Sequence, residues 1–249
     1  RRIFLKWFYR HIDYAFYVGT NNKRYFEKHG ISPDNLFFAP HSIDIDRFYD
    51  QTGENQRKGE QFRFKEGIST GRILVTFVGK FVPKKDPLLL LRAAKSPECS
   101  HLDFLFVGNG VLEDQMKIEA GNRKNIHFMD FKNQSEMPAI YYMSDLICLP
   151  SQGPGETWGL VINEAMSCER AVIASDKCGC SADLIQEGEN GFIFESGNKQ
   201  DLIKKLKKIN SIDEVKAMGK SSREIIQKWS YEKTVKGFEK GIQSVFGNY

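Results

Sequence analysis

The sequence has few of the features that would tie it to a bilayer, to an oxidising compartment or to a structural metal. No apolar run in its 249 residues approaches the roughly 20 residues that a membrane span needs. No secretory leader is visible, and because the chain opens at Arg1 without Met, we expect the natural start to lie upstream. Its five cysteines are odd in number and lack framework spacing, which favours a reducing, cytoplasmic location. Cys178 and Cys180 have no second pair downstream, so we expect them to pack in a turn.

Charge and composition leave a broad class open. A net charge of +4, with 41% hydrophobic and 27% charged residues, is ordinary for a globular protein of one or two domains. The mild positive balance is compatible with an anionic ligand, and we predict no nucleic-acid partner. The basic, aromatic segment 1–11 has two interpretations, a helix that packs its aromatic face on a domain and a peripheral membrane contact, and we favour the first.

Apolar runs alternate with helical patterns along most of the chain. This alternation predicts an α/β fold, a doubly wound parallel sheet of the Rossmann-like kind with right-handed crossovers. By contrast, the polar segment 52–60 shows no apolar periodicity, and we expect a mobile surface loop there. The expected strands are 15–18, 36–39, 73–78, 104–107, 126–129, 145–149 and 192–194, and the expected helices are 21–29, 88–95, 112–120, 137–143, 160–166, 199–209, 214–229 and 231–245.

Three loops of the predicted sheet carry polar residues where strands end. Residues 79–85 bring lysines, residues 108–110 read Gly-Asn-Gly, and Glu156 follows the Gly-rich turn 153–155. Because ligands of such sheets bind at the carboxyl ends of the strands, we expect one site there. The Gly-Asn-Gly turn lacks the third glycine of a dinucleotide fingerprint, which argues against a dehydrogenase.

Two carboxylates eight positions apart organise this site. Glu156 precedes a predicted helix, and Glu164 lies about a turn and a half inside it. The free N–H groups and the positive dipole end of that helix suit a phosphate, with a carboxylate on either side to accept hydroxyl hydrogen bonds. The alternative is a solvated helix face that carries two ordinary glutamates.

The same stretch resembles the donor-site core of glycosyltransferase family 4. The resemblance rests on Glu156-x7-Glu164 with Ala-Met after it, and on 171–175, 183–185 and 189–192, and it extends from about residue 15 to the C-terminus. It implies a retaining enzyme of the GT-B fold that uses no cofactor and no metal. Lys80 stands where the family usually has Arg, and Asp130 where it commonly has Gly. The residues implied as catalytic are Glu156, Lys85 and Lys80, and those implied as donor-binding are Gly79, Gly108, Asn109, Phe131, Gly155, Thr157, Trp158, Gly159 and Glu164.

The resemblance also implies a division of the chain. Residues 1–48 would be the remnant of an N-terminal acceptor domain with its linker, 72–229 the nucleotide-sugar donor-binding domain, and 230–249 a helix that returns to the N-terminal domain. Asp44-Ile45-Asp46 matches the metal motif of the other large glycosyltransferase fold. In this linker we interpret it as turn and cap chemistry, and we predict no metal.

The function that follows is transfer of a sugar from a nucleotide-sugar to an acceptor hydroxyl, with retention, in glycan or glycolipid (polysaccharide) assembly. Glu156 would hold donor-sugar hydroxyls, Glu164 the ribose, and the lysines the departing diphosphate. The acceptor would be a glycan or lipid-linked molecule, in the cytoplasm or at the inner face of the membrane. Two alternatives remain, a non-catalytic nucleotide-sugar-binding module and a nucleotide-sugar epimerase or hydrolase on a similar fold. Because most of an acceptor domain is missing, we expect the chain as given to be inactive alone.

Overall fold

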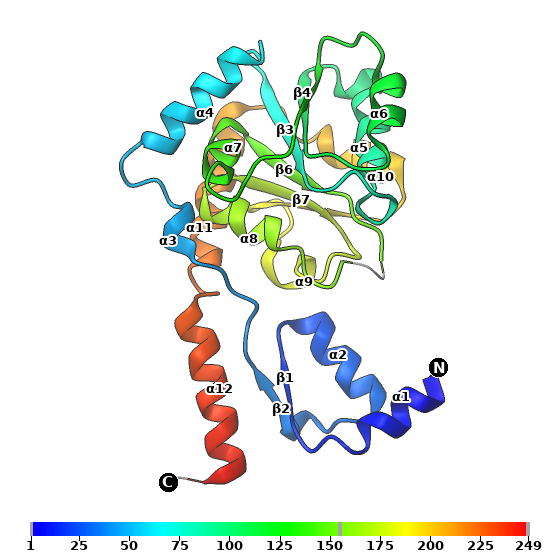
Figure 1. The fold of residues 1–249 in the computed structure, drawn as a ribbon, viewed down its shortest axis with the longest axis vertical. Coiled ribbons are helices and arrows are strands. Elements are labelled where there is room, and N and C mark those ends of the chain that lie inside the picture. The colour runs from blue at the N-terminus through cyan, green and yellow to red at the C-terminus, as the bar shows by residue number, and fades with distance from the viewer. Residues whose placement is uncertain (1, 154–155, 248–249) are drawn as a thin grey trace. The chain divides into compact units, whose positions relative to one another are not determined.

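A computed structural model describes residues 2–153 and 156–247 and divides the chain into two compact units (Figure 1). The larger unit runs from Ile45 to Ile226, and the smaller combines residues 1–44 with 227–249. The larger unit therefore includes two helices, α3 (Ile45–Phe48) and α4 (Glu54–Lys65), that precede the donor-binding domain expected at 72–229. Among the described residues, no helix is both long and apolar enough to cross a bilayer.

The doubly wound parallel sheet that the sequence predicts forms the centre of the larger unit. It has six strands, one of which, Ala171–Ser175, was not among those expected. Its order is β5-β4-β3-β6-β7-β8, and every neighbouring pair is parallel. The chain winds outward from β3 in both directions, which makes the sheet doubly wound. The strands are β3 (Ile73–Val78), β4 (Leu102–Val107), β5 (Ile126–Met129), β6 (Leu146–Leu149), β7 (Ala171–Ser175) and β8 (Gly191–Phe194).

Helices cover both faces of this sheet (Figure 1). On one face, α5 contacts β4, α6 and α10; on the other, α11 and α8 contact β7, and α7 contacts α4 and α8. Because both faces are buried, the strands are continuous apolar runs rather than alternating ones. The helices are α5 (Pro87–Ala94), α6 (Glu113–Ala120), α7 (Met137–Met143), α8 (Leu160–Ser167), α9 (Ser181–Leu184), α10 (Lys199–Leu206) and α11 (Ile212–Ile226).

The main core lies between the sheet and the first of these helical layers. Val75, Phe77 and Phe106 point into it and meet the leucines of α5. Thr76 faces the other side, where Ser144 Oγ donates a hydrogen bond of 2.7 Å to its Oγ1. The buried hydroxyl of Thr76 is therefore hydrogen-bonded, although it lies in an apolar strand.

Helix α4 overturns the prediction of a mobile loop at 52–60. Its first turn is held by the Asp50 carboxylate, which accepts hydrogen bonds from Glu54 N at 3.1 Å and Gln56 N at 2.8 Å. Its buried side contacts α7 through Gly59 and Arg63. A glycine and an arginine produce no apolar periodicity, so the hydrophobic pattern could not reveal this helix.

Gly59→Ala tests that contact, and we expect it to destabilise the protein by about 1–3 kcal/mol through overpacking. A Cβ at this position would lie 2.7 Å from Met143 N and 2.8 Å from Ala139 O. Helix propensity alone predicts the opposite sign, a gain of roughly 0.5–1 kcal/mol. Urea unfolding of the variant beside exposed Gln61→Ala measures the sign. A more stable Gly59→Ala protein would contradict the close contact of α4 with α7.

The smaller unit is a two-stranded parallel sheet with helix α12 packed on it. Gly237 and Gly241 allow the close approach, because a Cβ at Gly237 would lie 2.1 Å from Phe38 O and one at Gly241 would lie 2.5 Å from the Phe16 ring. Thr234 Oγ1 also donates to Pro40 O at 2.8 Å. The elements are α1 (Arg2–Tyr9), β1 (Ala15–Tyr17), α2 (Thr20–His29), β2 (Leu36–Phe38) and α12 (Tyr231–Phe246).

Candidate functional site

The loops after β3 and β4 contact each other at the carboxyl edge of the sheet. Gly79 N donates to Val107 O at 3.0 Å, and Phe81 N donates to Asn109 O at 2.8 Å. Gly108 has φ 139° and its Cβ would lie 2.1 Å from Gly79 O, so only glycine fits there. The structure thus brings together the three glycine-loop residues that the sequence predicts, Gly79, Gly108 and Asn109.

An ion pair joins two of the predicted catalytic residues at the same edge. Lys85 Nζ contacts Glu156 Oε2 across 71 positions of sequence, and Ser151 Oγ donates to the same carboxylate oxygen at 2.9 Å. The two charged side chains are only 22% and 13% exposed. Ser151, which the sequence analysis did not identify, is in turn fixed by Ser175 Oγ, a donor to its carbonyl at 2.5 Å. The carboxylate is therefore held in one place, next to an ammonium group.

The amino terminus of α8 lies directly after this carboxylate. Gly159 precedes the helix with φ 105°, and a Cβ there would lie 2.8 Å from Leu149 Cδ2. The first N–H groups of α8 have no hydrogen-bond acceptor within the helix. An anion near Gly159 is therefore favourable. Thr157 is exposed beside it, and the predicted ligand residue Gly155 lies outside the described residues.

Trp158 and both cysteines of the Cys178–Cys180 turn are buried and support the loop that precedes α8. The indole is 3% exposed and its Nε1 donates to Asn163 Oδ1 at 2.9 Å. If Trp158 contacts a ligand, we therefore expect the contact to come from its backbone. A Cβ on Gly179 would lie 1.9 Å from Thr157 O, and both cysteines beside it are buried and free. The predicted packing role of this turn is confirmed. Among the described residues, no three His, Cys, Asp or Glu side chains gather as a metal site.

Glu164 points from α8 to a buried partner that the sequence analysis missed. The Tyr141 hydroxyl on α7, fully buried, donates to Glu164 Oε2. Burial raises the pKa of the Glu164 carboxyl, against the Tyr141 hydrogen bond and the charge of Arg47, which both lower it. Burial and the neighbouring Glu164 raise the pKa of Tyr141 as well. One carboxylate oxygen is thus fixed by the protein.

Tyr141→Phe should move the pKa of Glu164 further up, because it removes the donor that favours the ionised form. A carboxyl with a raised folded pKa stabilises the fold below its unfolded pKa, and this contribution is lost as pH rises through the folded pKa. The wild type should therefore lose stability relative to Glu164→Gln as pH rises above the ordinary glutamate range. In Tyr141→Phe this loss should extend to higher pH, as urea unfolding at a series of pH values can measure. Identical pH profiles for the wild type and Tyr141→Phe would show that the hydrogen bond does not control this titration.

The remaining predicted residues lie at the edge of the site. Lys80 and Asn109 are exposed in the loops after β3 and β4. Phe131 follows β5 and is 67% exposed, which leaves an aromatic face open to solvent. No hydrogen bond in the described part of the chain fixes the Lys80 side chain. The structure therefore places these three near the same edge without the fixed geometry of Lys85 and Glu156.

Solved structures share this fold. HepE of Anabaena in complex with UDP aligns with a TM-score of 0.81 at 19% identity, covering 98% of this chain and 67% of that chain. A glycosyltransferase from Rickettsia africae aligns with a TM-score of 0.81 at 21% identity, covering 98% of this chain and 68% of that one.

Two curated relatives match at higher identity. An uncharacterized glycosyltransferase of Methanocaldococcus jannaschii is 30% identical over 167 residues, covering 66% of this chain and 46% of that protein. A D-inositol 3-phosphate glycosyltransferase of Rhodococcus erythropolis is 30% identical over 188 residues, covering 70% of this chain and 40% of that protein. The chain spans about half the length of the curated relatives it matches, or less.

The family-level comparison covers most of the larger unit. The sequence model described as "Glycosyl transferases group 1" matches residues 58–226, more than half of the chain. The GT-B resemblance that the two glutamates suggest is confirmed at this level, because the solved structures that share the fold include glycosyltransferases. The chain therefore belongs to the group 1 glycosyl transferases.

Proposed function

We propose that the chain carries the nucleotide-sugar donor site of a retaining glycosyltransferase. The observation that supports this most directly is the Lys85–Glu156 ion pair beside the amino terminus of α8. A cation and free N–H groups suit a diphosphate, and a fixed carboxylate suits sugar hydroxyls. Glu164, one turn into the helix, is assigned to the ribose. The Anabaena HepE structures with UDP and with UDP-glucose support a donor of this kind.

The reaction that fits these groups is a front-face transfer. The anomeric C–O bond of the donor breaks while the acceptor oxygen bonds to the same face of that carbon. The acceptor proton passes to the departing diphosphate, whose charge Lys85 and the α8 amino terminus stabilise. A double displacement would need Glu156 or another carboxylate as nucleophile. Glu156 is a weak candidate, because Lys85 and Ser151 both bind its Oε2.

The rest of the assignment follows from that site. Lysine and backbone N–H groups would neutralise the diphosphate, so we propose no cofactor and no metal, with the nucleotide-sugar as substrate. Residues 72–229 would be the donor-binding domain, 1–48 the remnant of the acceptor domain with its linker, and 230–249 the returning helix; the smaller unit contains residues 1–44 of that remnant and the helix. The acceptor would be a glycan or a lipid-linked molecule in polysaccharide assembly, in the cytoplasm or at the inner membrane face. Proton NMR of the product tests retention, since an inverted anomeric centre would contradict it.

Glu156→Gln should affect two ligands in opposite ways. In the free protein the Glu156 carboxylate forms an ion pair with the Lys85 ammonium. Neutralising Glu156 frees this ammonium for the diphosphate, so UDP affinity should be unchanged or tighter. A bound sugar would instead lose a charged acceptor worth about 1.5–3 kcal/mol, which is about 10-fold or more in UDP-glucose affinity relative to UDP.

Calorimetric titration with UDP and UDP-glucose measures this ratio, beside Glu113→Gln, which neutralises a partly buried glutamate paired with Lys117 on α6. Equal losses for both ligands in Glu156→Gln would contradict a sugar-binding role. If neither a panel of nucleotide sugars nor their free diphosphates bound the wild type, the proposed donor site itself would be wrong.

A further inference from the structure

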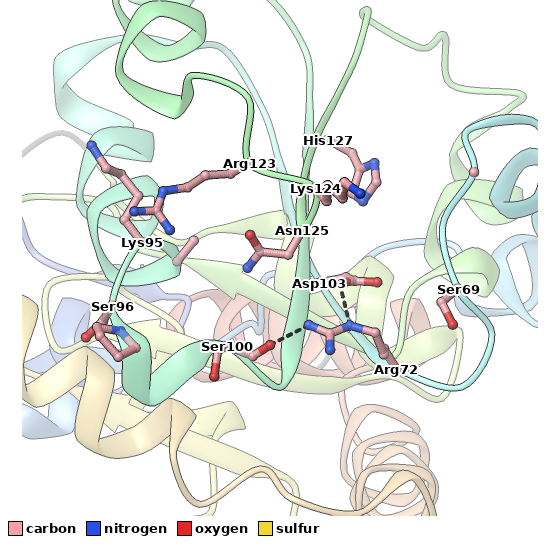
Figure 2. Close-up of a pocket in the computed structure, with 13 residues that line it drawn as sticks. Ser69, Arg72, Lys95, Ser96, Ser100, Asp103, Arg123, Lys124, Asn125 and His127 are labelled. Atoms are coloured by element: carbon pink, nitrogen blue, oxygen red, sulfur yellow. Dashed lines mark hydrogen bonds and ion pairs between the residues drawn. The ribbon is translucent and has the colours of Figure 1, made fainter.

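A polar cavity opens at the amino edge of the same sheet, the edge opposite to Lys85 and Glu156. Its volume is about 600 Å³, and the segments just before and within the first residues of β3, β4 and β5 line it with the end of α5 (Figure 2). Nothing in the proposed transfer uses this edge, because donor ligands of such sheets bind at the carboxyl ends of the strands.

The cavity collects positive charge and hydrogen-bond donors. Its lining includes four cations, a single carboxylate, three serines and an asparagine: Arg72, Lys95, Arg123, Lys124, Asp103, Ser69, Ser96, Ser100 and Asn125. Figure 2 shows these side chains around the opening, with Lys95 and Arg123 extending on the same side. A mouth of this composition favours an anion with several acceptor oxygens.

Two of the four cations form contacts within the protein that account for their positions. Arg72 Nε donates to Asp103 Oδ1 at 2.7 Å, and its Nη2 donates to Ser100 O and Leu102 O at 2.6 and 2.9 Å. Lys95 follows α5, where a cation complements the helix dipole, and it lies 3.8 Å from a carboxylate oxygen of Glu119. Packing and helix chemistry account for both residues without a ligand.

Arg123 and Lys124 have no such explanation. They lie in the loop between α6 and β5, beyond the last residue of the helix, and both are exposed. Within residues 2–153 and 156–247, neither forms an ion pair. Two adjacent cations thus border a cavity in which the one carboxylate among the described lining residues, that of Asp103, is already bound to Arg72.

His127, on β5, gives an independent observation. Its Nε2 is buried and has no hydrogen-bond partner among the residues that the structure describes. Burial lowers the pKa of this imidazole, while the charges of Asp103 and Glu66 oppose that effect. Because Nε2 has no accessible surface, an anion in the cavity that His127 lines would lie beside the imidazole and act on it through its charge.

We propose that this cavity is a binding site for a small phosphorylated anion, held by Arg123 and Lys124, with the Ser69 and Ser100 hydroxyls as further donors and His127 beside it. Its volume lies within the range of pockets that hold metabolite-sized ligands. The phosphate could belong to a free phosphorylated compound or to the nucleoside diphosphate that the proposed reaction releases, because both present the same oxygens.

The test reads His127 directly in the full chain. Carbon-13 NMR follows the ring signals of the histidines with pH, with His127→Gln to assign its own, while inorganic pyrophosphate or UDP is titrated in. Pyrophosphate should move the His127 signal and raise its pKa, since the anion favours the protonated ring. Arg123→Ser/Lys124→Ser should raise the half-saturating concentration about 10-fold or more. Lys216→Ser/Lys220→Ser removes the same charge from another cavity of the unit and should change it less than about twofold.

Each outcome decides the proposal. Saturation at lower UDP than pyrophosphate would identify the nucleoside diphosphate as occupant, and the reverse would identify a phosphate group alone. The proposal is overturned if the His127 signal does not move, or if both double variants lose affinity equally. It is also overturned if Lys85→Ala abolishes the response, because the signal would then report the donor site. Persistence of the response in a protein that binds no nucleotide-sugar would support this site while the proposed function failed.

Discussion

Lys85→Ala should weaken UDP binding about 10- to 100-fold and leave uridine binding within about twofold. The ammonium group contacts Glu156 at the carboxyl edge of the sheet, where the proposed diphosphate would lie. A hydrogen bond to a charged group contributes about 1.5–3 kcal/mol, which gives the expected range. Because the ligand must compete with Glu156 for the ammonium, the loss should fall toward the lower end. Uridine has no phosphate and should not detect the change.

Calorimetry with the two ligands measures the difference. Lys84→Ala is a matched control, because Lys84 is exposed next to Lys85 and its carbonyl, which accepts from Gln152 N, remains. Titration in EDTA should give the same affinities. A need for Mg²⁺ or Mn²⁺ would instead indicate that Asp44 and Asp46 form a metal-binding motif. If Lys85→Ala weakened UDP and uridine equally, the lysine would act through the structure of the loop instead.

The central sheet could be predicted from sequence because its strands are buried on both faces. The run 73–78 is continuous and apolar, and the structure has β3 at Ile73–Val78. The proximity of Lys85 and Glu156 followed from the rule that loops at the carboxyl ends of parallel strands lie at one edge. Their ion pair, across 71 positions, did not follow from it, because side-chain contacts depend on register and loop conformation.

Helix α4, Tyr141 and Ser151 could not be predicted, because no hydrophobic periodicity or motif in the sequence identifies them. Helix α4 buries a glycine and an arginine, and Arg63 is paired with Asp145 at 3.1 Å, a contact that exists only once the chain is folded. Tyr141 lies within an apolar helical run, where its spacing resembles that of any core residue. Ser151 follows β6 as one polar residue among several. Arg63 and Tyr141 have their roles through partners distant in sequence, and Ser151 through a carboxylate five positions away that the loop conformation brings to it. Neither periodicity nor spacing indicates such contacts.

Asp86 shows the same limit on a smaller scale. It precedes Pro87 and holds the N-cap position of α5. Its side chain makes no capping hydrogen bond, however, and accepts from Gln152 Nε2 at 2.5 Å instead. Asp86 adopts a left-handed conformation with φ 48°. Its bond to Gln152 links the loop of Lys85 to the loop of Glu156. This bond spans 66 positions and exists only in the folded chain.

Glu164→Ala should weaken UDP and uridine equally, by about 10- to 100-fold, which is the pattern opposite to that of Lys85→Ala. If the carboxylate accepts the ribose hydroxyls, both ligands lose the same charge-assisted bond, worth about 1.5–3 kcal/mol. Tyr141 occupies Oε2, so the second carboxylate oxygen would receive the ribose. Because burial raises the pKa of Glu164, affinity for both ligands should increase as pH rises through that pKa.

Stability separates this role from damage to the fold. Glu164→Ala leaves the buried Tyr141 hydroxyl without its acceptor, at a cost of about 1–3 kcal/mol that Glu164→Gln should largely avoid. The double variant Tyr141→Phe/Glu164→Ala removes both partners and should regain stability while nucleotide binding stays weak. Urea unfolding and calorimetry with both ligands measure the two effects. If uridine bound the double variant as tightly as the wild type, Glu164 would be a partner of Tyr141 alone, and the ribose would have to be held by another group.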